Sequence, residues 1–383
     1  MKYFRMNDSA PASRRPLLKQ TWVRVLPGVL VTFACLWWAV DQMRNDESGG
    51  KRPVSEVVDL VKHAFTDADY KTLPLMLAAL VLFYWIKAVR WKLLLTPFGD
   101  FRPVRDLTPS VMTGFAFNNV LPAHLGEFVR VFVFSRQTGL PAATILTTVV
   151  LERLFDVIAI LTLLMASLLT MNVQDMPPEL TNAAWLFSGA VVAFLLIAAV
   201  YIIWTKPVST FIEAVLRRIP FLPAGLSGKI ITLMTTGAEG LNSLRSVRLL
   251  IGIGFTSLLQ WILNGVIIYL ALHAFDVTIN AQVAGILLFA VAVSVTIPST
   301  PGYFGVINVC FDMVLKLFSD AGSAVFIPAS IYYHMAQWIP VTAVGMLLFL
   351  RTGFRLSDVN QAREKGPAAE AVTSPGEPDE ATA

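Results

Sequence analysis

Six long apolar runs constrain this chain more than any other feature of its sequence. Each run is about long enough, at roughly 1.5 Å per helical residue, to cross the roughly 30 Å hydrocarbon core of a bilayer. The runs lie at residues 22–40, 73–95, 142–170, 183–204, 249–275 and 324–350. Only 15% of the residues are charged, against roughly 25% in an average soluble domain. The sequence therefore predicts an all-α polytopic membrane protein.

The loops between the runs predict an orientation, because cytoplasmic loops carry an excess of Lys and Arg. Such residues gather at 1–20, 87–105, 206–248 and 351–355. The loops at 171–182 and 276–282 contain neither Lys nor Arg. We therefore expect a cytoplasmic N-terminal segment, residues 1–20, and a transmembrane domain over residues 21–352. The tail, residues 353–383, is rich in Ala, Glu, Pro and Gly and is expected to be cytoplasmic and disordered.

Two short segments, residues 118–130 and 296–304, place Pro and Gly where a continuous membrane helix would have neither. Both follow the pattern apolar-Pro-x-x-x-Gly-x-Phe. The matching positions are Pro122 with Pro298, Gly126 with Gly302, and Phe128 with Phe304. A membrane helix broken in this way must bury its free backbone groups in protein or expose them to a wet cavity.

The side of the membrane on which each loop lies predicts that each break belongs to a re-entrant helical hairpin. The chain is on the cytoplasmic side before and after the first break, and on the outer side before and after the second. We thus expect about six full transmembrane helices plus two opposed re-entrant hairpins. This is an inverted repeat of about residues 73–170 against 249–350. Transporters of this kind bind substrate near the midplane, where the broken helices meet.

Charged residues follow the first break. Glu127 and Arg130 lie three apart, on one helix face, and Glu152, Arg153 and Asp156 lie inside an apolar run. Each charge at bilayer depth costs at least about 2.5–3.5 kcal/mol. One interpretation is that Arg130 or Arg153 binds a phosphate while the carboxylates hold each Arg in place. The other is a structural salt-bridge network between the hairpin and the next span. The two are not exclusive.

Uncharged polar residues and the breaks themselves supply further candidates. His124 is placed to bind a head group or to cap exposed backbone, and Asn308 is a candidate for a cavity lining. Gln260 and His334 are expected to form hydrogen bonds inside the bundle by default. The backbone N–H groups after each break would favour an anion. The remaining substrate-binding candidates are Asn118, Pro122, Gly126, Pro298, Pro301, Gly302 and Gly305.

Several classes of site find no support in the sequence. The two cysteines, Cys35 and Cys310, lie in separate apolar segments, and the four histidines are scattered. This pattern predicts neither a disulfide framework nor a zinc site. No basic stripe with interleaved aromatics indicates a nucleic-acid partner. We therefore predict no metal, no cofactor and no catalytic constellation.

Three motifs occur in a fixed order along the chain. They are Asn-x-x-Leu-Pro-x-x-x-Gly-Glu-x-x-Arg from residue 118, Glu-Arg-Leu-x-Asp from 152 and Ile-Pro-x-x-Pro-Gly-x-x-Gly from 297. Together with Arg90-Trp91, they resemble the membrane domain of the lysylphosphatidylglycerol synthase/flippase family over nearly all of residues 20–352. The resemblance implies an integral membrane domain that moves an aminoacylated phospholipid or a polyprenyl-linked lipid between leaflets.

Two departures from the family pattern concern the head group. The family often has Glu at the position of Asn308 and Arg near Tyr333 and His334. If those charges bind the head group of the family's lipid, we expect this chain to prefer a different head group. The sequence also shows no soluble aminoacyltransferase domain after the last span, so lysyl-lipid synthesis is not expected.

The leading hypothesis is thus a lipid translocase of the bacterial inner membrane, with the head group between the hairpins and the chains in lipid. No nucleotide-binding motif is present, so transport would be passive, ion-coupled or driven by a partner. One alternative is a membrane enzyme acting on a lipid-linked substrate, with Glu127 or Asp156 as base. Another is a non-transporting accessory subunit that binds a partner protein of an envelope lipid or glycan pathway.

Overall fold

The long helices of this protein coincide with most of the apolar runs. A computed structural model describes residues 17–45, 50–121, 125–172, 246–296 and 301–354, with isolated residues between 189 and 214 and at 358. The run at 183–204, the loop at 206–248 and most of the tail therefore lie outside the described residues. Within the described part the chain is helical, apart from one isolated bridge between Asn45 and Lys51.

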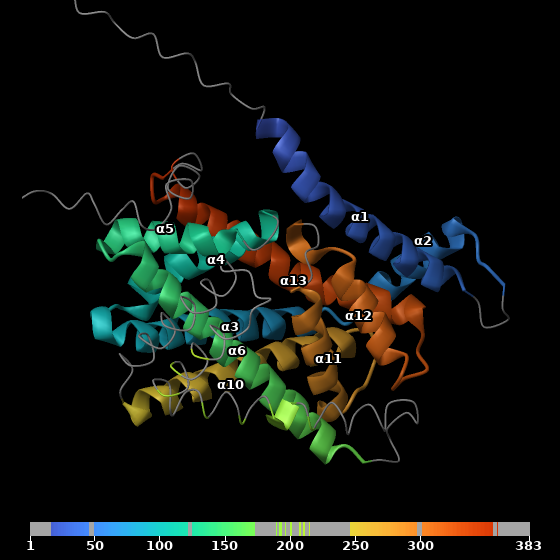
Figure 1. Cartoon of the computed structure of the whole chain (residues 1–383). Helices are drawn as coiled ribbons and strands as arrows, with labels where there is room; N and C mark the ends of the chain where they lie inside the picture. Colours follow the sequence, from blue (N-terminus) through green and yellow to red (C-terminus); the bar gives the residue numbers. More distant parts are fainter. Residues whose placement is uncertain are drawn as a thin grey trace, which may run out of the picture.

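The described elements follow one another in chain order (Figure 1). They are α1 (Leu17–Arg44), α2 (Val54–Asp67), α3 (Thr72–Leu95), η1 (Thr96–Phe98), the π-helical turn η2 (Pro103–Leu107), α4 (Thr108–Val120), α5 (Gly126–Thr138), α6 (Ala142–Thr170), α10 (Val247–His273), α11 (Ala281–Ser294), η4 (Pro301–Tyr303), α12 (Val306–Leu315) and α13 (Ser323–Leu350).

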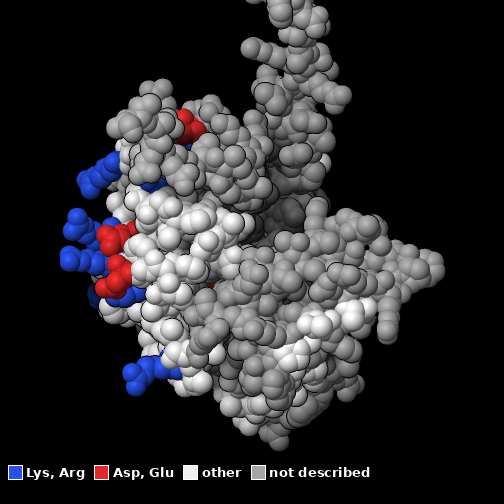
Figure 2. Space-filling model, turned by 60° about the vertical axis from the view of Figure 1, so that its left-hand side comes forward, with Lys and Arg blue, Asp and Glu red and all other residues white. Residues whose placement is uncertain are grey.

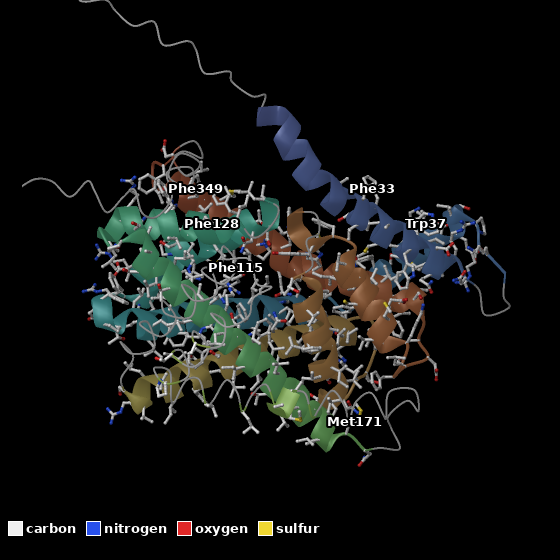
Figure 3. The ribbon with its side chains drawn as sticks, in the orientation of Figure 1. Phe33, Trp37, Phe115, Phe128, Met171 and Phe349 are labelled. Carbon is white, nitrogen blue, oxygen red and sulfur yellow. The ribbon has the colours of Figure 1, made fainter. Side chains whose placement is uncertain are left out.

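Three of the described helices are long and apolar enough to cross a membrane. They are α3 with its 3₁₀ extension (Thr72–Phe98), α10 and α13. These correspond to three of the six predicted spans. The runs at 22–40 and 142–170 form the long helices α1 and α6, which are not among the three. On α1, Phe33 and Trp37 are exposed side chains (Figure 3).

The first broken segment is a pair of short helices, α4 and α5, of 13 residues each. At about 1.5 Å per residue each is about 20 Å long, less than a bilayer core. Their backbones touch, because a Cβ added at Gly126 would overlap the carbonyl oxygen of Gly114. The Asn118 side chain accepts a hydrogen bond from the Gly126 N–H at 2.8 Å. Asn118 therefore satisfies the first amide of α5 across the break.

The second broken segment joins α11 to α12 through η4. Its backbone takes positive φ values at Gly302 (79°), Tyr303 (60°) and Gly305 (85°). Glycine tolerates this region, whereas a bulky residue such as Tyr303 is strained there. A Cβ added at Gly302 would lie 3.1 Å from the carbonyl oxygen of Asn119, at the end of α4. The two broken segments therefore meet in space.

The helices pack mainly in two pairs, and α6 lies against one of these pairs. α3 lies along α10, α4 lies along α13, and α6 contacts α3, α10 and α11 (Figure 1). The backbones of α4 and α13 also touch, since a Cβ added at Gly345 would overlap the Met112 carbonyl. The main core gathers Ile267, Leu287, Phe311 and related apolar side chains from α10 to α13.

Exposed basic side chains gather at one end of the bundle (Figure 2). They include Lys92, Arg102, Arg105, Arg136 and Arg248, near the ends of α3 and α5 and the start of α10. At this end Lys92 lies 2.9 Å from Asp100, and its hydrogen bond lowers the pKa of that carboxyl. The opposite end is marked by the Asp69 N–H, which donates to the Ala274 carbonyl at 2.8 Å.

The structure corrects one step of the topology argument. Lys87 and Arg90 were counted with the loop residues that mark the cytoplasmic end of the second span. Their side chains are instead 2% and 0% exposed, inside the bundle. Helical spacing explains why they differ from Lys92. Lys87 and Arg90 are three residues apart and share the inward face of α3, whereas Lys92 lies on another face.

Candidate functional site

A cluster of charged side chains lies between α3, α5 and α6, and we call it the charge cluster. α3 supplies two cations, α5 supplies an acid and a base, and α6 supplies two acids and a base. The members are Lys87, Arg90, Glu127, Arg130, Glu152, Arg153 and Asp156. Lys87 and Arg90 are three residues apart on α3, and Glu127 and Arg130 are three apart on α5, so each pair shares a helix face. On α6, Asp156 lies four residues after Glu152 and three after the adjacent Arg153. The sequence predicted five of the seven.

Glu152 is the centre of the charge cluster. Its carboxylate lies 2.9 Å from Lys87 Nζ, 3.1 Å from Arg90 Nη2 and 2.8 Å from Arg130 Nη2. The side chain is 0% exposed. It stands about 15 Å along α6 from the first residue of that helix. One buried carboxylate thus holds cations from two other helices.

Asp156 ties the charge cluster to α10. It forms a two-point ion pair with Arg90, with oxygen–nitrogen distances of 2.6 and 3.3 Å. It also accepts hydrogen bonds from Gln260 Nε2 at 2.6 Å and from the Trp261 indole at 2.9 Å. Gln260 was predicted as a polar group inside the bundle, and this contact gives it a partner in the charge cluster.

Arg130 is enclosed rather than accessible. Its guanidinium lies 3.9 Å from the centre of the Trp91 ring, a cation–π arrangement. The Trp91 indole in turn donates to Thr148 Oγ1 at 3.0 Å. Arg130 is 0% exposed, and its closer carboxylate is Glu152, while Glu127 is 4.0 Å away. A phosphate outside the bundle therefore does not reach Arg130 in this conformation.

Arg153 is the accessible cation of the charge cluster. Its side chain is 43% exposed. It lies 2.6 Å from Glu127 and 3.4 Å from Asp156, over the ring of Phe115 in the middle of the bundle (Figure 3). The seven side chains carry four positive and three negative formal charges, a net charge of +1. Arg153 is the cation of the cluster with the most exposed side chain.

A cavity of about 170 Å³ adjoins the charge cluster, and we call it the central cavity. Trp261, which donates to Asp156, is part of its wall, and so is Tyr84, which packs against Phe115. Both breaks border it, through Asn119 and Tyr303. The other polar or aromatic lining residues are Asn264, Tyr333, His334, Gln337 and Trp338.

Two asparagines predicted near the substrate cap helix ends in this structure. Asn118 occupies the N–H of Gly126, so that amide is not a free donor for an anion. Asn308 accepts from the Gly305 N–H at 3.2 Å and donates to Ser330 Oγ at 2.6 Å. Asn308 borders a second, apolar cavity of about 610 Å³ between α1, α2, α12 and α13, rather than the central cavity.

His334 separates the two cavities, since it lines both. Its ring packs against Phe304 at 4.9 Å, just after the second break. Gly302 lies against the Trp338 indole, and Pro301 is the first residue of η4. The predicted site residues Pro122, His124 and Pro298 lie outside the described residues. In the described ranges, no group of His, Cys, Asp and Glu is arranged to hold a metal ion.

Comparison with known proteins gives a family and a distant relative. The sequence model of the family described as lysylphosphatidylglycerol synthase TM region matches residues 25–345. The chain belongs to this family. A UPF0104 membrane protein from the archaeon Methanocaldococcus jannaschii is 23% identical over 237 residues, which are 61% of this chain and 92% of the relative. No solved structure matches.

Membership of the lysylphosphatidylglycerol synthase TM family confirms the predicted resemblance and identifies the chain as a membrane protein. The matched region includes all seven residues of the charge cluster and the central cavity. The sequence did not predict the roles of Lys87, Arg90 and Trp261. The spacing of three between Lys87 and Arg90 in an otherwise apolar helix was the signal for a shared buried face.

Proposed function

We propose that this protein is a lipid translocase, which moves a phosphate-containing phospholipid or a polyprenyl-linked lipid between the leaflets of a cytoplasmic membrane. The observation that carries the proposal is the net positive charge of the cluster, whose side chains are buried apart from Arg153, 43% exposed, and Glu127, 17% exposed. In this proposal Arg153 contacts the lipid phosphate. Arg130, Glu127 and Glu152 hold the arrangement in place.

Electrostatics favours this assignment over a purely structural network. A buried charge is tolerated when it is paired, and six of the seven formal charges can be matched as three pairs. The remaining positive charge needs an anion or water. A phosphate offers two or more oxygens to the planar guanidinium, which is the geometry that Arg binds best. In a membrane, the phosphates of lipid head groups supply such an anion.

The arrangement of the short helices supports a transport role. We propose that α4–α5 and α11–α12 are re-entrant hairpins, because each helix is too short to cross a bilayer. Their breaks meet beside the central cavity, through Asn119 and Gly302. A head group held between two such hairpins would become accessible to alternate sides when one hairpin moves against the other.

Lipid flipping in proteoliposomes tests the proposal directly. Dithionite reduction of fluorescent phosphatidylglycerol would report the flipping rate of the purified full-length chain. Replacing Arg153→Gln removes a charge-assisted hydrogen bond worth about 1.5–3 kcal/mol, so the rate should fall about 10- to 100-fold. Arg105→Gln is the matched control, because that side chain is 78% exposed at the basic end and should leave the rate unchanged.

Arg153→Lys separates charge from geometry, since Lys keeps the charge and loses the planar fork. We expect an intermediate rate. Size-exclusion profiles and helical circular dichroism would confirm that each variant is folded. A wild-type rate in folded Arg153→Gln protein would remove the phosphate-binding role. Absence of flipping by the wild-type protein, with this probe and with a polyprenyl-phosphate probe, would remove the translocase proposal.

A further inference from the structure

The central cavity differs from the charge cluster beside it in having no charged acid or base of the Asp, Glu, Lys or Arg type among its described lining residues. His334 is the one basic lining side chain, and none is acidic. A cationic head group would therefore find no counter-charge there.

The polar groups of the cavity form a neutral hydrogen-bonding network. Asn264 Nδ2 donates to Gln337 Oε1 at 3.2 Å, and the Tyr333 hydroxyl donates to Asn264 Oδ1 at 3.0 Å. The Trp338 indole N–H is buried and has no hydrogen-bond acceptor within the part of the chain that the structure describes. Amides and hydroxyls of this kind suit a partner that both donates and accepts, as a hydroxyl does, whereas an ammonium only donates.

Aromatic rings supply much of the remaining wall. Tyr84, Trp261, Tyr303 and Trp338 all line the cavity. Such rings combine an apolar face with a polar edge, which matches a polyol, whose carbon skeleton is apolar and whose rim is hydroxylated. A volume of about 170 Å³ is of the size of one glycerol or one sugar-like ring.

We infer that the central cavity selects lipids whose head group is a neutral polyol and excludes lipids with an amine or aminoacyl head group. This inference rests on the proposed binding of the lipid phosphate at Arg153. Trp261 and Tyr84 place the cavity next to the charge cluster, so the head group extends from the phosphate into the cavity. Transferring an ammonium into a cavity without a carboxylate is strongly unfavourable. A polyol exchanges its bonds to water for bonds to amides.

Competitive lipid retention tests the inference without requiring transport. Purified full-length protein in mixed micelles would receive equal amounts of dioleoyl phosphatidylinositol, phosphatidylglycerol, phosphatidylethanolamine and lysylphosphatidylglycerol, with bound lipid measured by native mass spectrometry. The acyl chains are identical, so the head group alone decides. We expect the two polyol lipids to be retained about tenfold over the two amine lipids, a difference of about 1.4 kcal/mol. Equal or greater retention of the amine lipids would overturn the inference.

A cavity variant and its control locate the preference. Gln337→Leu removes an amide from the cavity and should weaken phosphatidylinositol retention about 3- to 10-fold, as expected for one lost hydrogen bond. Retention of phosphatidic acid, which has no head group beyond its phosphate, should not change and reports that the variant is folded. Gln282→Leu, outside the central cavity at the start of α11, is the matched control and should retain the preference. Loss of phosphatidylinositol in both variants, or in neither, would contradict the location.

Two further comparisons complete the test. The first distinguishes a lipid head group from a soluble polyol phosphate, and the second distinguishes polyol selection from translocation. Soluble inositol 1-phosphate and glycerol 3-phosphate should fail to displace bound phosphatidylinositol, and displacement by either would overturn the lipid-linked assignment. Polyol preference without flipping would leave the binding inference intact and remove translocation. Flipping without polyol preference would leave the translocase proposal intact and remove the binding inference.

Discussion

At the scale of single residues, Glu152 carries the most consequence, because three cations from α3 and α5 depend on one carboxylate. Its side chain is fully buried, so water cannot take over the role of the carboxylate. The partner Asp156 already binds Arg90 and two donors from α10 and cannot replace Glu152.

We therefore predict a large loss of stability for Glu152→Gln. Breaking a buried pair by removing one partner costs about 3–5 kcal/mol, because the other charges remain buried and uncompensated. Thermal unfolding in detergent micelles, followed by tryptophan fluorescence, would show the lower midpoint. Glu56→Gln is the control. That carboxylate pairs with Arg52 at 3.3 Å with its side chain 51% exposed, so its change should lie within about 0.5 kcal/mol. Equal midpoints for the two variants would argue against a central role for Glu152.

The candidate site was predictable at this scale only where a charge stood out from its surroundings. Glu152, Arg153 and Asp156 interrupt an apolar run, and the structure brings them together with Arg130 as partners. Lys87 and Arg90 escaped prediction because they precede Lys92 and resemble the basic end of a span. Only the packing of α3 against α6 shows that they face inward.

At the scale of helices, the α4–α5 pair combines backbone contact with side-chain packing, since Phe117 of α4 clusters with Val129 and Val133 of α5. Gly114 and Gly126 let the two helices approach closely, and Asn118 then reaches the first amide of α5. Small residues commonly permit this approach between membrane helices. The close contact places Glu127 and Arg130 against α6, so the geometry of the charge cluster depends on it.

Gly126→Ala should accordingly separate α4 from α5. The added methyl group would overlap the Gly114 carbonyl, and overpacking of this kind costs about 1–3 kcal/mol or more. Gly254→Ala on α10 is the matched control, since nothing lies within 4 Å of the added Cβ. The unfolding midpoint should fall for the first variant and stay level or rise for the second. An unchanged unfolding midpoint in Gly126→Ala would indicate that α4 and α5 can separate without a loss of stability.

The breaks themselves were predicted from Pro and Gly, because these residues interrupt a helix for local reasons. What the sequence could not provide was the partner of each break. Asn119 Nδ2 donates to Thr342 Oγ1 at 2.9 Å, a contact between residues more than two hundred positions apart. Such contacts depend on how α4 lies along α13, which periodicity does not reveal.

At the scale of the whole molecule, the exposed basic residues at one end imply an orientation. The start of α3 and the turn after α10 lie together at the other end, joined by the bond from Asp69 to Ala274. The correction at Lys87 and Arg90 leaves this argument standing, because Lys92, Arg102 and Arg105 remain at the basic end. The orientation is a prediction from the positive-inside rule.

Single-cysteine labelling checks the orientation. In a background of Cys35→Ser and Cys310→Ser, Thr278→Cys lies in the exposed turn after α10, and Gln137→Cys is exposed near the end of α5. A membrane-impermeant maleimide added to intact cells should label the first and not the second. Permeabilised cells should label both, which controls for accessibility. The reverse pattern in intact cells would place the basic end outside.

The two broken segments also differ in what they allow to move. In the first, α5 is held to α4 by glycine contacts and to α6 by ion pairs. The second turns on Gly302 and Gly305, with Tyr303 strained between them. Backbone rotation at these residues relieves strain rather than creating it. A strained backbone position therefore lies beside the central cavity, at Tyr303, whereas the residues of the charge cluster have none.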